Sequence, residues 1–148
     1  MKQDDKELLL RDLFGRLPYG VKVKTILKEP YTLKGLFDTE YGGVMGCLLG
    51  KYVPNNVSPK TTNYPLWQFK PYLFPLSSMT DEQKKELHNI QGVLTVDFEL
   101  EEYKMVHLFQ SQNTIDWLNK NHFDYRGLIE AGLAVDATSL NIYKEETK

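Results

Sequence analysis

The sequence predicts an α+β protein: a small antiparallel sheet, an N-terminal helix packed on it, and further helices towards the C-terminus. Three observations support this fold class. Residues 4–17 have the apolar spacing of a helix, residues 21–49 contain consecutive short strands separated by turns, and residues 113–133 carry helix start and stop signals. Such a β-meander can stay open or curl into a barrel-like sheet, and the sequence leaves both alternatives open.

The first predicted helix runs from about Asp5 to Gly15. Asp4 and Glu7 have the spacing of a capping box, and Pro18 ends the helix. Its inward face is predicted from apolar residues three and four positions apart, Leu10, Leu13, Phe14 and Leu17, and Leu9 widens this face.

Three strands follow the helix. Valines and lysines alternate over residues 21–27, which predicts a half-buried strand with the valines inside. Residues 31–37 form a second predicted strand. Residues 44–49 are wholly apolar and predict a central third strand, in which Cys47 is a small buried hydrophobe without a cationic neighbour to activate its thiol.

The middle of the chain carries weaker signals. Residues 53–65 predict a long loop, residues 66–69 a short strand, and residues 70–76 an extended path imposed by two prolines. Thr80 and Gln83 have the spacing of a capping box and begin a surface helix.

The second half of the chain ends in short elements. Residues 94–100 alternate as a strand, and residues 103–109 fit a helix and a strand equally well. A helix is expected over residues 114–121 and a short strand around 134–135. The polar tail after Leu140 is expected to fray.

The segment from Phe123 to Leu133 predicts a helix of two turns. Asp124 is a suitable N-cap, and Phe123 and Leu128 are spaced for a hydrophobic staple. Gly132 stands where a helix often ends in the left-handed conformation, so that Leu133 would pack on Leu128 in a Schellman motif.

Two charges in this segment oppose the dipole of the predicted helix, because Arg126 lies in the first turn and Glu130 in the last. One interpretation is an intramolecular ion pair of Arg126 with Asp116, Asp124 or Asp136. The other is a candidate partner surface made by four residues: His122, Tyr125, Arg126 and Glu130.

Lysines of the meander are a second candidate surface. Lys22, Lys24 and Lys34 are predicted to share one sheet face, with Tyr31 nearby. Lysines and aromatic rings on a small sheet can bind nucleic acid, whereas the simpler interpretation is a solvated face that protects a sheet edge.

No catalytic, cofactor-binding or metal-ligating residue is predicted. The three histidines, His88, His107 and His122, lack the spacing of a zinc site, and no nucleophile elbow or phosphate loop is present. An enzyme is therefore the least favoured class.

Composition is that of a soluble globular protein. The chain has 148 residues, 41% of them hydrophobic and 26% charged, which suits a single domain over 1–148. An alternative subdivision separates a mainly β part, 1–76, from a mixed part, 77–148. The net charge of −2 is unlike that of most nucleic-acid binders, and no stretch reaches the ~20 apolar residues of a membrane span. We expect a cytoplasmic protein that does not contact a membrane.

Several runs of the chain resemble one family of proteins: Leu17-Pro18-Tyr19-Gly20-Val21, Lys70-Pro71-Tyr72-Leu73, Leu76-Ser77-Ser78-Met79-Thr80, and Asp116-Trp117-Leu118-Asn119 through Ala134. The chain is similar there to small uncharacterised proteins encoded in prophages and mobile elements of Bacteroides-like gut bacteria. Family members often have an arginine where this chain has Phe74. The resemblance implies a bacterial or phage setting and no activity or catalytic residue.

These observations predict a non-enzymatic accessory or interaction protein of a prophage or mobile element, with a protein partner or self-association. The alternative is a small nucleic-acid-binding regulator that uses the lysine face. Neither prediction requires a cofactor or a metal ion.

Overall fold

The structure is a computed structural model that describes residues 2–25, 30–39, 43–49, 61–91 and 112–143. The predictions for residues 94–100 and 103–109, and those for the side chain of Cys47, lie outside the described residues. The elements are α1 (Gln3–Arg16), η1 (Leu17–Tyr19), β1 (Lys22–Lys24), β2 (Tyr31–Thr39), β3 (Gly43–Leu49), β4 (Thr61–Pro65), η2 (Leu66–Gln68), β5 (Lys70–Pro75), η3 (Leu76–Ser78), α2 (Asp81–Gln91), α4 (Gln112–Lys120), β6 (Phe123–Asp124) and β7 (Val135–Asp136).

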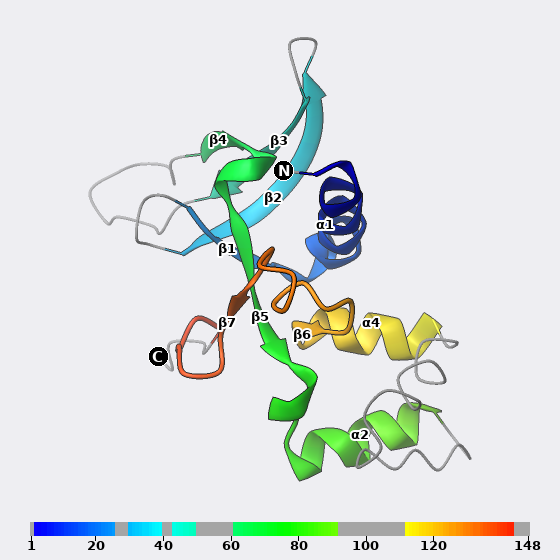
Figure 1. Ribbon diagram of the computed structural model, residues 1–148. Coiled ribbons are helices and arrows are strands. Elements are labelled where there is room, and N and C mark those ends of the chain that lie inside the picture. The colour runs from blue at the N-terminus through cyan, green and yellow to red at the C-terminus, as the bar shows by residue number, and fades with distance from the viewer. Residues whose placement is uncertain (1, 26–29, 40–42, 50–60, 92–111, 144–148) are drawn as a thin grey trace.

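The described strands form one sheet in the order β4-β3-β2-β1-β5-β6, with β7 also paired to β5 (Figure 1). The antiparallel pairing of β1, β2 and β3 confirms the predicted run of three strands, and the α+β class is confirmed with it. Residues 61–65 form β4 on β3, so the loop predicted over residues 53–65 is wrong there, and the rest of that loop lies outside the described residues. The barrel-like alternative is wrong, because the sheet is open. The sheet is also mixed, since β6 and β7 both run parallel to β5.

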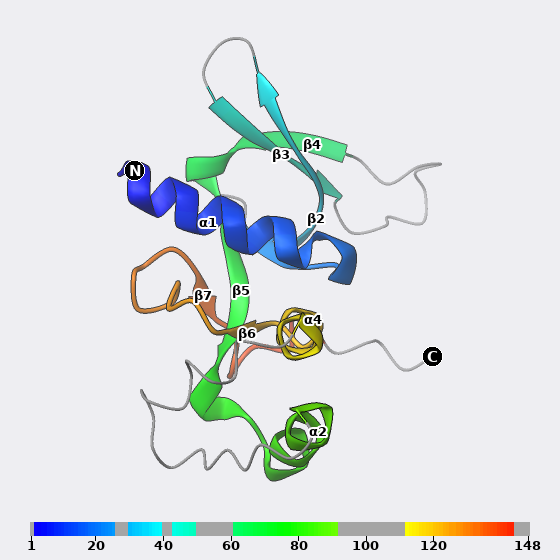
Figure 2. The same cartoon turned by 90° about the vertical axis from the view of Figure 1, so that its right-hand side faces the viewer.

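Strand β5 connects the two halves of the molecule (Figures 1 and 2). Its first residues pair with β1, its middle with β7 and its end with β6. The upper hydrophobic cluster packs α1 against the meander and includes Leu9, Leu13, Val21, Val23 and Leu33. The lower cluster joins α2 and α4 and includes Met79, Leu87, Trp117, Leu118 and Phe123. The predicted alternation in β1 is confirmed, because both valines are fully buried and Lys24 is exposed.

The inward face of helix α1 is confirmed except at Phe14, since Leu10 and Leu17 also pack against the upper cluster. Leu9 and Leu13 are buried together with Asp12 and Arg16, whereas Phe14 is 57% exposed. The predicted capping box is absent, because the N-cap is Lys2 and no side chain caps the first turn. The inward face also carries the buried ion pair of Asp12 and Arg16, which the apolar pattern did not predict.

Two predictions in the middle of the chain have opposite outcomes. Residues 66–68 form the 3₁₀ turn η2, so the strand predicted there is wrong. The predicted extended path through residues 70–75 is confirmed as β5. The capping box of α2 is confirmed in both directions, because Gln83 N donates to Thr80 Oγ1 at 3.1 Å and Thr80 N donates to Gln83 Oε1 at 2.9 Å.

The predicted two-turn helix at residues 123–133 is wrong in length. Phe123 and Asp124 form β6 on β5, and only a single turn follows, in which Ala131 N donates to Gly127 O at 3.1 Å. The first helical turn does not form because Phe123 and Asp124 are extended and pair with β5. Phe123 and Leu128 also lie in different clusters, so the predicted staple does not form.

The predicted Schellman closure of this turn is confirmed. Gly132 has φ +75°, Leu133 N donates to Leu128 O at 2.8 Å, and Gly132 N donates to Ile129 O at 3.0 Å. Asp124 also caps the turn, but its carboxylate accepts from the amides four and five residues later, whereas a standard N-cap accepts from those two or three residues later. Its carboxylate accepts from Leu128 N and Ile129 N, both at 2.9 Å.

Candidate functional site

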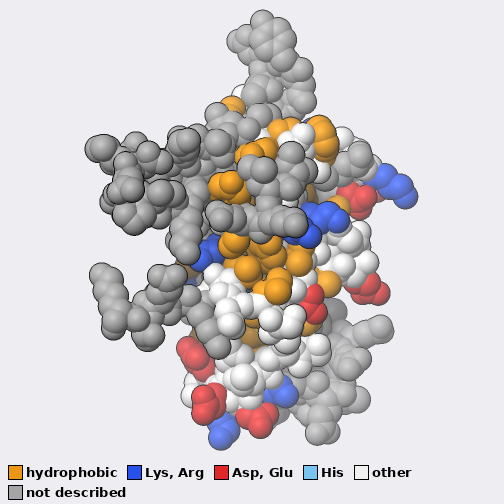
Figure 3. Space-filling model, turned by 90° about the vertical axis from the view of Figure 1, so that its left-hand side faces the viewer, with side chains coloured by type: hydrophobic (Ala, Val, Ile, Leu, Met, Phe, Trp, Pro, Cys, Tyr) orange, Lys and Arg blue, Asp and Glu red, His pale blue; other side chains and the backbone are white. Residues whose placement is uncertain are grey.

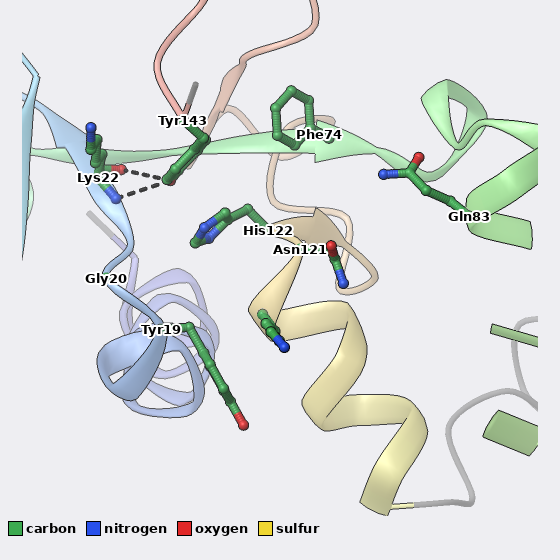
Figure 4. A pocket seen from close by; sticks show the side chains of 9 residues that line it. Tyr19, Gly20, Lys22, Phe74, Gln83, Asn121, His122 and Tyr143 are labelled. Carbon is green, nitrogen blue, oxygen red and sulfur yellow. Dashed lines mark hydrogen bonds between the residues drawn. The ribbon is translucent and has the colours of Figure 1, made fainter. Parts of the chain in front are cut away.

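A cavity of about 450 Å³ lies where η1, β1, β5 and the end of α4 meet (Figure 4). We call it the His122 cavity. It is lined by Tyr19, Gly20, Lys22, Phe74, Gln83, Lys120, Asn121, His122 and Tyr143. Its volume lies within the roughly 300–1,000 Å³ of small-molecule pockets.

His122 has a strained backbone. It follows α4 in the position at which a Schellman motif turns left-handed, with φ +61°, and its N–H donates to Asn119 O at 3.1 Å. Glycine is the usual residue there, because a side chain in this region costs about 1–2 kcal/mol. Gly132 fulfils that preference in the second Schellman motif, and His122 does not. Strain of this kind often accompanies a functional side chain.

His122 is buried, with 8% of its residue surface exposed. The Nδ1 atom of its imidazole has no hydrogen-bond partner among the described atoms. Figure 4 shows the ring pointing from the end of α4 towards Lys22 and Gly20. A buried polar atom without a partner carries a desolvation cost of about 1–3 kcal/mol.

Tyr143 forms the opposite wall. Its ring stacks on His122 with centroids 3.7 Å apart and 12° between the planes. Its hydroxyl donates to Tyr72 O at 2.7 Å and accepts from Lys22 N at 2.9 Å (Figure 4). The prediction of a frayed tail after Leu140 is therefore wrong through Tyr143, because hydrogen bonds to two strands hold the tail in place.

The charge of the cavity is positive. Lys22 and Lys120 line it, and no Asp or Glu is among the described residues that line it. The ammonium of Lys22 donates to Ile142 O at 2.9 Å, a neutral acceptor that leaves its charge uncompensated. Burial, together with the positive charges of Arg16 and Lys22, lowers the pKa of His122 to about 4. His122 is therefore neutral at pH 7.

A buried cluster of charges, made by Asp12, Arg16 and Arg126, lies near the cavity without lining it. Arg16 and Asp12 are both fully buried, and Arg16 Nε donates to Asp12 Oδ2 at 2.7 Å. Arg16 Nη2 also donates to Asp12 Oδ1 at 3.0 Å and to Phe123 O at 2.6 Å. Arg126 Nε lies 3.6 Å from Asp12 Oδ1. Two guanidinium groups thus share one carboxylate, which leaves a net positive charge near the cavity.

The four residues of the predicted partner surface have different environments. His122 is buried in the cavity, Tyr125 and Arg126 are half-buried, and Glu130 is exposed. Arg126 pairs within the chain, but with Asp12 of α1 and with none of the three acids expected. Arg126 Nη2 also donates to the Tyr125 hydroxyl at 3.3 Å. Binding of a partner by these residues stays a prediction.

The predicted lysine face divides. Lys24 and Lys34 are exposed, whereas Lys22 is half-buried and lines the His122 cavity. Lys24 pairs in register with Lys70 of β5, which is also exposed. Tyr31 packs against the upper cluster, so it does not accompany the lysines. The structure therefore brings one residue of each predicted set, Lys22 and His122, into one cavity.

Most of the other residues that line the cavity were not expected from the sequence. Tyr143 had one signal, since Ile142 and Tyr143 form an apolar pair inside a polar tail. Asp12 and Arg16 also had a signal, because they lie three and seven positions after the buried Leu9. Phe74, Gln83 and Asn121 had none, because strands and helices far apart in sequence bring them together.

The cavity is better suited to binding than to proton transfer. An efficient general base has a pKa near the working pH, and that of His122 is about 4. Burial raises the pKa of Tyr143, so its hydroxyl keeps its proton at pH 7. Within the described ranges, no group of three or more His, Cys, Asp or Glu side chains is placed to hold a metal ion.

The fold and the cavity define an α+β protein with a positively charged, partly aromatic cavity between a mixed sheet and a helix end. No protein-family model, curated protein or solved structure shows a significant match to the chain. In the part of the chain that the structure describes, no helix has the length and apolar character needed to cross a bilayer.

Proposed function

We propose that this chain is a non-enzymatic accessory protein that binds an anionic ligand in the His122 cavity. One observation carries the proposal: Lys22 and Lys120 line the cavity beside the buried, unpartnered Nδ1 of His122, and no carboxylate lies among the described residues that line it. A charged group from a ligand would compensate the positive charge of the two lysines. The setting in a prophage or mobile element, suggested by resemblance, stays a prediction.

Unfolding by urea with and without inorganic phosphate, at matched ionic strength, tests the proposal. A ligand that binds only the folded state raises the free energy of unfolding, by about 1.4 kcal/mol at ten times its dissociation constant. We expect phosphate to stabilise the wild type and to stabilise Lys22→Met less. Lys24→Met is the matched control, since Lys24 lies on the same strand and outside the cavity.

Two outcomes would contradict this function. One is that phosphate stabilises the wild type no more than chloride does. The other is an equal loss of phosphate stabilisation in Lys22→Met and Lys24→Met, which would show that charge on β1 matters irrespective of the cavity.

The second candidate is a nucleic-acid-binding regulator, favoured by the exposed pair of Lys24 and Lys70 on neighbouring strands. Figure 3 views the molecule from the side of β7 and the C-terminal segment, and the basic side chains visible there are scattered. Retention on heparin that collapses between low and moderate salt, and that Lys24→Met with Lys70→Met removes, would favour this candidate. The absence of a gel shift with DNA or RNA at low salt would rule it out.

A further inference from the structure

A second cavity lies beside the His122 cavity. A space of about 230 Å³ adjoins it and shares Phe74 and Gln83 with it. The other residues that line this second cavity are Ser78, Thr80, Phe123 and Thr138. We call it the Phe74 cavity. Figure 4 shows Phe74 and Gln83 on the side of the His122 cavity away from Lys22.

The two cavities differ in chemistry. The His122 cavity holds the lysines, whereas the described residues that line the Phe74 cavity include two phenyl rings, three hydroxyls, one carboxamide and no charged side chain. Phe74 and Phe123 have ring centroids 6.2 Å apart and lie tilted at 57°. A ligand that fits both cavities therefore has an anionic end and an uncharged, flat end of moderate polarity.

Two carboxamides that line the His122 cavity each have a hydrogen-bonding group left over, and Gln83 also lines the Phe74 cavity. Gln83 uses Oε1 to accept from Thr80 N, which leaves its Nε2 as a donor. Asn121 uses Nδ2 to donate to Trp117 O at 2.9 Å, which leaves its Oδ1 as an acceptor. One donor and one acceptor are the kinds of group that complement the edge of a nucleobase.

We propose that these two neighbouring cavities together bind a nucleoside 5′-monophosphate, with the phosphate beside Lys22 and Lys120 and the base against Phe74. The proposal rests on the proposed function, since the phosphate is the anion of that site. The lysines supply the charge, Phe74 supplies a face on which a base can stack, and Gln83 and Asn121 supply the polar contacts. The same chemistry occurs in a free nucleotide and in the 5′-phosphorylated end of a strand.

Calorimetric titration with a ligand series tests this proposal. The series comprises AMP, GMP, CMP and UMP, followed by ribose 5-phosphate, adenosine and inorganic phosphate. We expect at least one nucleotide to bind tenfold or more tightly than ribose 5-phosphate, adenosine or phosphate. Equal affinity for all the phosphates would overturn the nucleotide proposal and keep the proposed function, whereas binding of no phosphate would overturn both.

Two variants separate the two ends of the ligand. Phe74→Leu removes the ring and is expected to lower nucleotide affinity about tenfold and inorganic phosphate affinity much less; retained phosphate binding also shows that the variant is folded. Lys22→Met is expected to weaken nucleotide and phosphate alike, with Lys24→Met as the control. A Phe74→Leu variant that folds and keeps full nucleotide affinity would contradict the placement of the base.

A last comparison separates the two sources of the nucleotide. A 5′-phosphorylated hexanucleotide and the same strand without its phosphate are titrated against the wild type. Preference for the phosphorylated strand over the free nucleotide identifies a strand end as the ligand, and the reverse order identifies the free nucleotide. If both strands bind equally and more tightly than any nucleotide, the phosphate site is not used and the proposal fails.

Discussion

The phenol ring of Tyr143 lies flat on the imidazole of His122, with the two centroids 3.7 Å apart. This contact joins the end of the described chain to the end of α4 and forms one side of the His122 cavity. The stack covers a histidine that is already strained in its backbone and unpaired at Nδ1. Stability of the tail and properties of the cavity are therefore coupled through these two residues.

Removal of the Tyr143 hydroxyl should destabilise the protein. Tyr143→Phe keeps the ring but leaves Lys22 N and Tyr72 O without a partner, so we expect the free energy of unfolding to fall by about 1–2 kcal/mol. Urea unfolding measures the loss. Tyr19→Phe is the control, because the Tyr19 hydroxyl makes no hydrogen bond to the described residues, and its expected change is within about 0.5 kcal/mol. Equal losses in the two variants would contradict this role.

The free energy of unfolding should decrease as the pH is lowered, because His122 becomes protonated on unfolding. The folded protein keeps His122 neutral down to about pH 4, whereas the unfolded chain protonates it near its ordinary pKa of 6.5. The unfolded state thus binds more protons in this window, and the free energy of unfolding decreases as pH falls from 6.5 to 4. At about 1.4 kcal/mol per pH unit, His122 contributes a decrease of up to about 3 kcal/mol.

His122→Asn isolates that contribution, because asparagine tolerates a positive φ and does not titrate. We expect its stability to depend less on pH than the wild type between pH 6.5 and 4, measured by urea unfolding at each pH. His88→Asn on α2 is the control and should follow the wild type. Parallel curves for His122→Asn and the wild type would show that His122 titrates normally.

The buried carboxylate of Asp12 should be more important for stability than any exposed charge on α1. Asp12→Leu leaves Arg16 and Arg126 without their acid, and loss of one partner of a buried pair costs about 3–5 kcal/mol. The exposed Arg11 on the same helix is the control, and Arg11→Met should change stability by less than about 0.5 kcal/mol. Chemical unfolding measures both.

The double variant Asp12→Leu with Arg16→Met tests whether the cost comes from the unpaired charge. Because no charge of the pair remains, we expect it to be more stable than Asp12→Leu alone. If the loss in the double variant equals the sum of the losses in Asp12→Leu and Arg16→Met measured singly, lost packing at α1 and not the unpaired charge is responsible.

Asp124 should stabilise the turn that precedes β7. Asp124→Ala removes the acceptor of Leu128 N and Ile129 N, and we expect a loss of about 2 kcal/mol. Asp136→Ala is the matched control, because the Asp136 carboxylate also accepts from a backbone amide, Thr138 N, but is exposed. Hydrogen exchange at the Leu128 and Ile129 amides reports the effect locally, and unchanged protection would contradict the cap.

Predictions that depend on neighbouring residues were the most accurate. The valine and lysine alternation in β1, the capping box of α2 and the Schellman closure at Gly132 are all confirmed. Each of them is a pattern over a few residues, whose hydrogen bonds or side-chain directions follow from the local backbone. The α+β class and the antiparallel meander follow from the same kind of signal.

Predictions failed where distant strands compete for the same residues. The helix expected from Phe123 shortened to one turn because its first residues pair with β5. The tail was expected to fray, and Tyr143 is held by Lys22 and Tyr72. The acid that pairs with Arg126 is on α1, more than a hundred residues away in the chain.

Local sequence patterns thus decided the elements and their caps, because the groups that satisfy them lie within one or two turns. The His122 cavity was decided by tertiary structure alone. It needs β1, β5, α4 and the C-terminal segment at one point, and only chain packing brings the charge of Lys22 next to the buried ring of His122. Burial and neighbouring positive charges, which no local pattern encodes, also lower the pKa of His122.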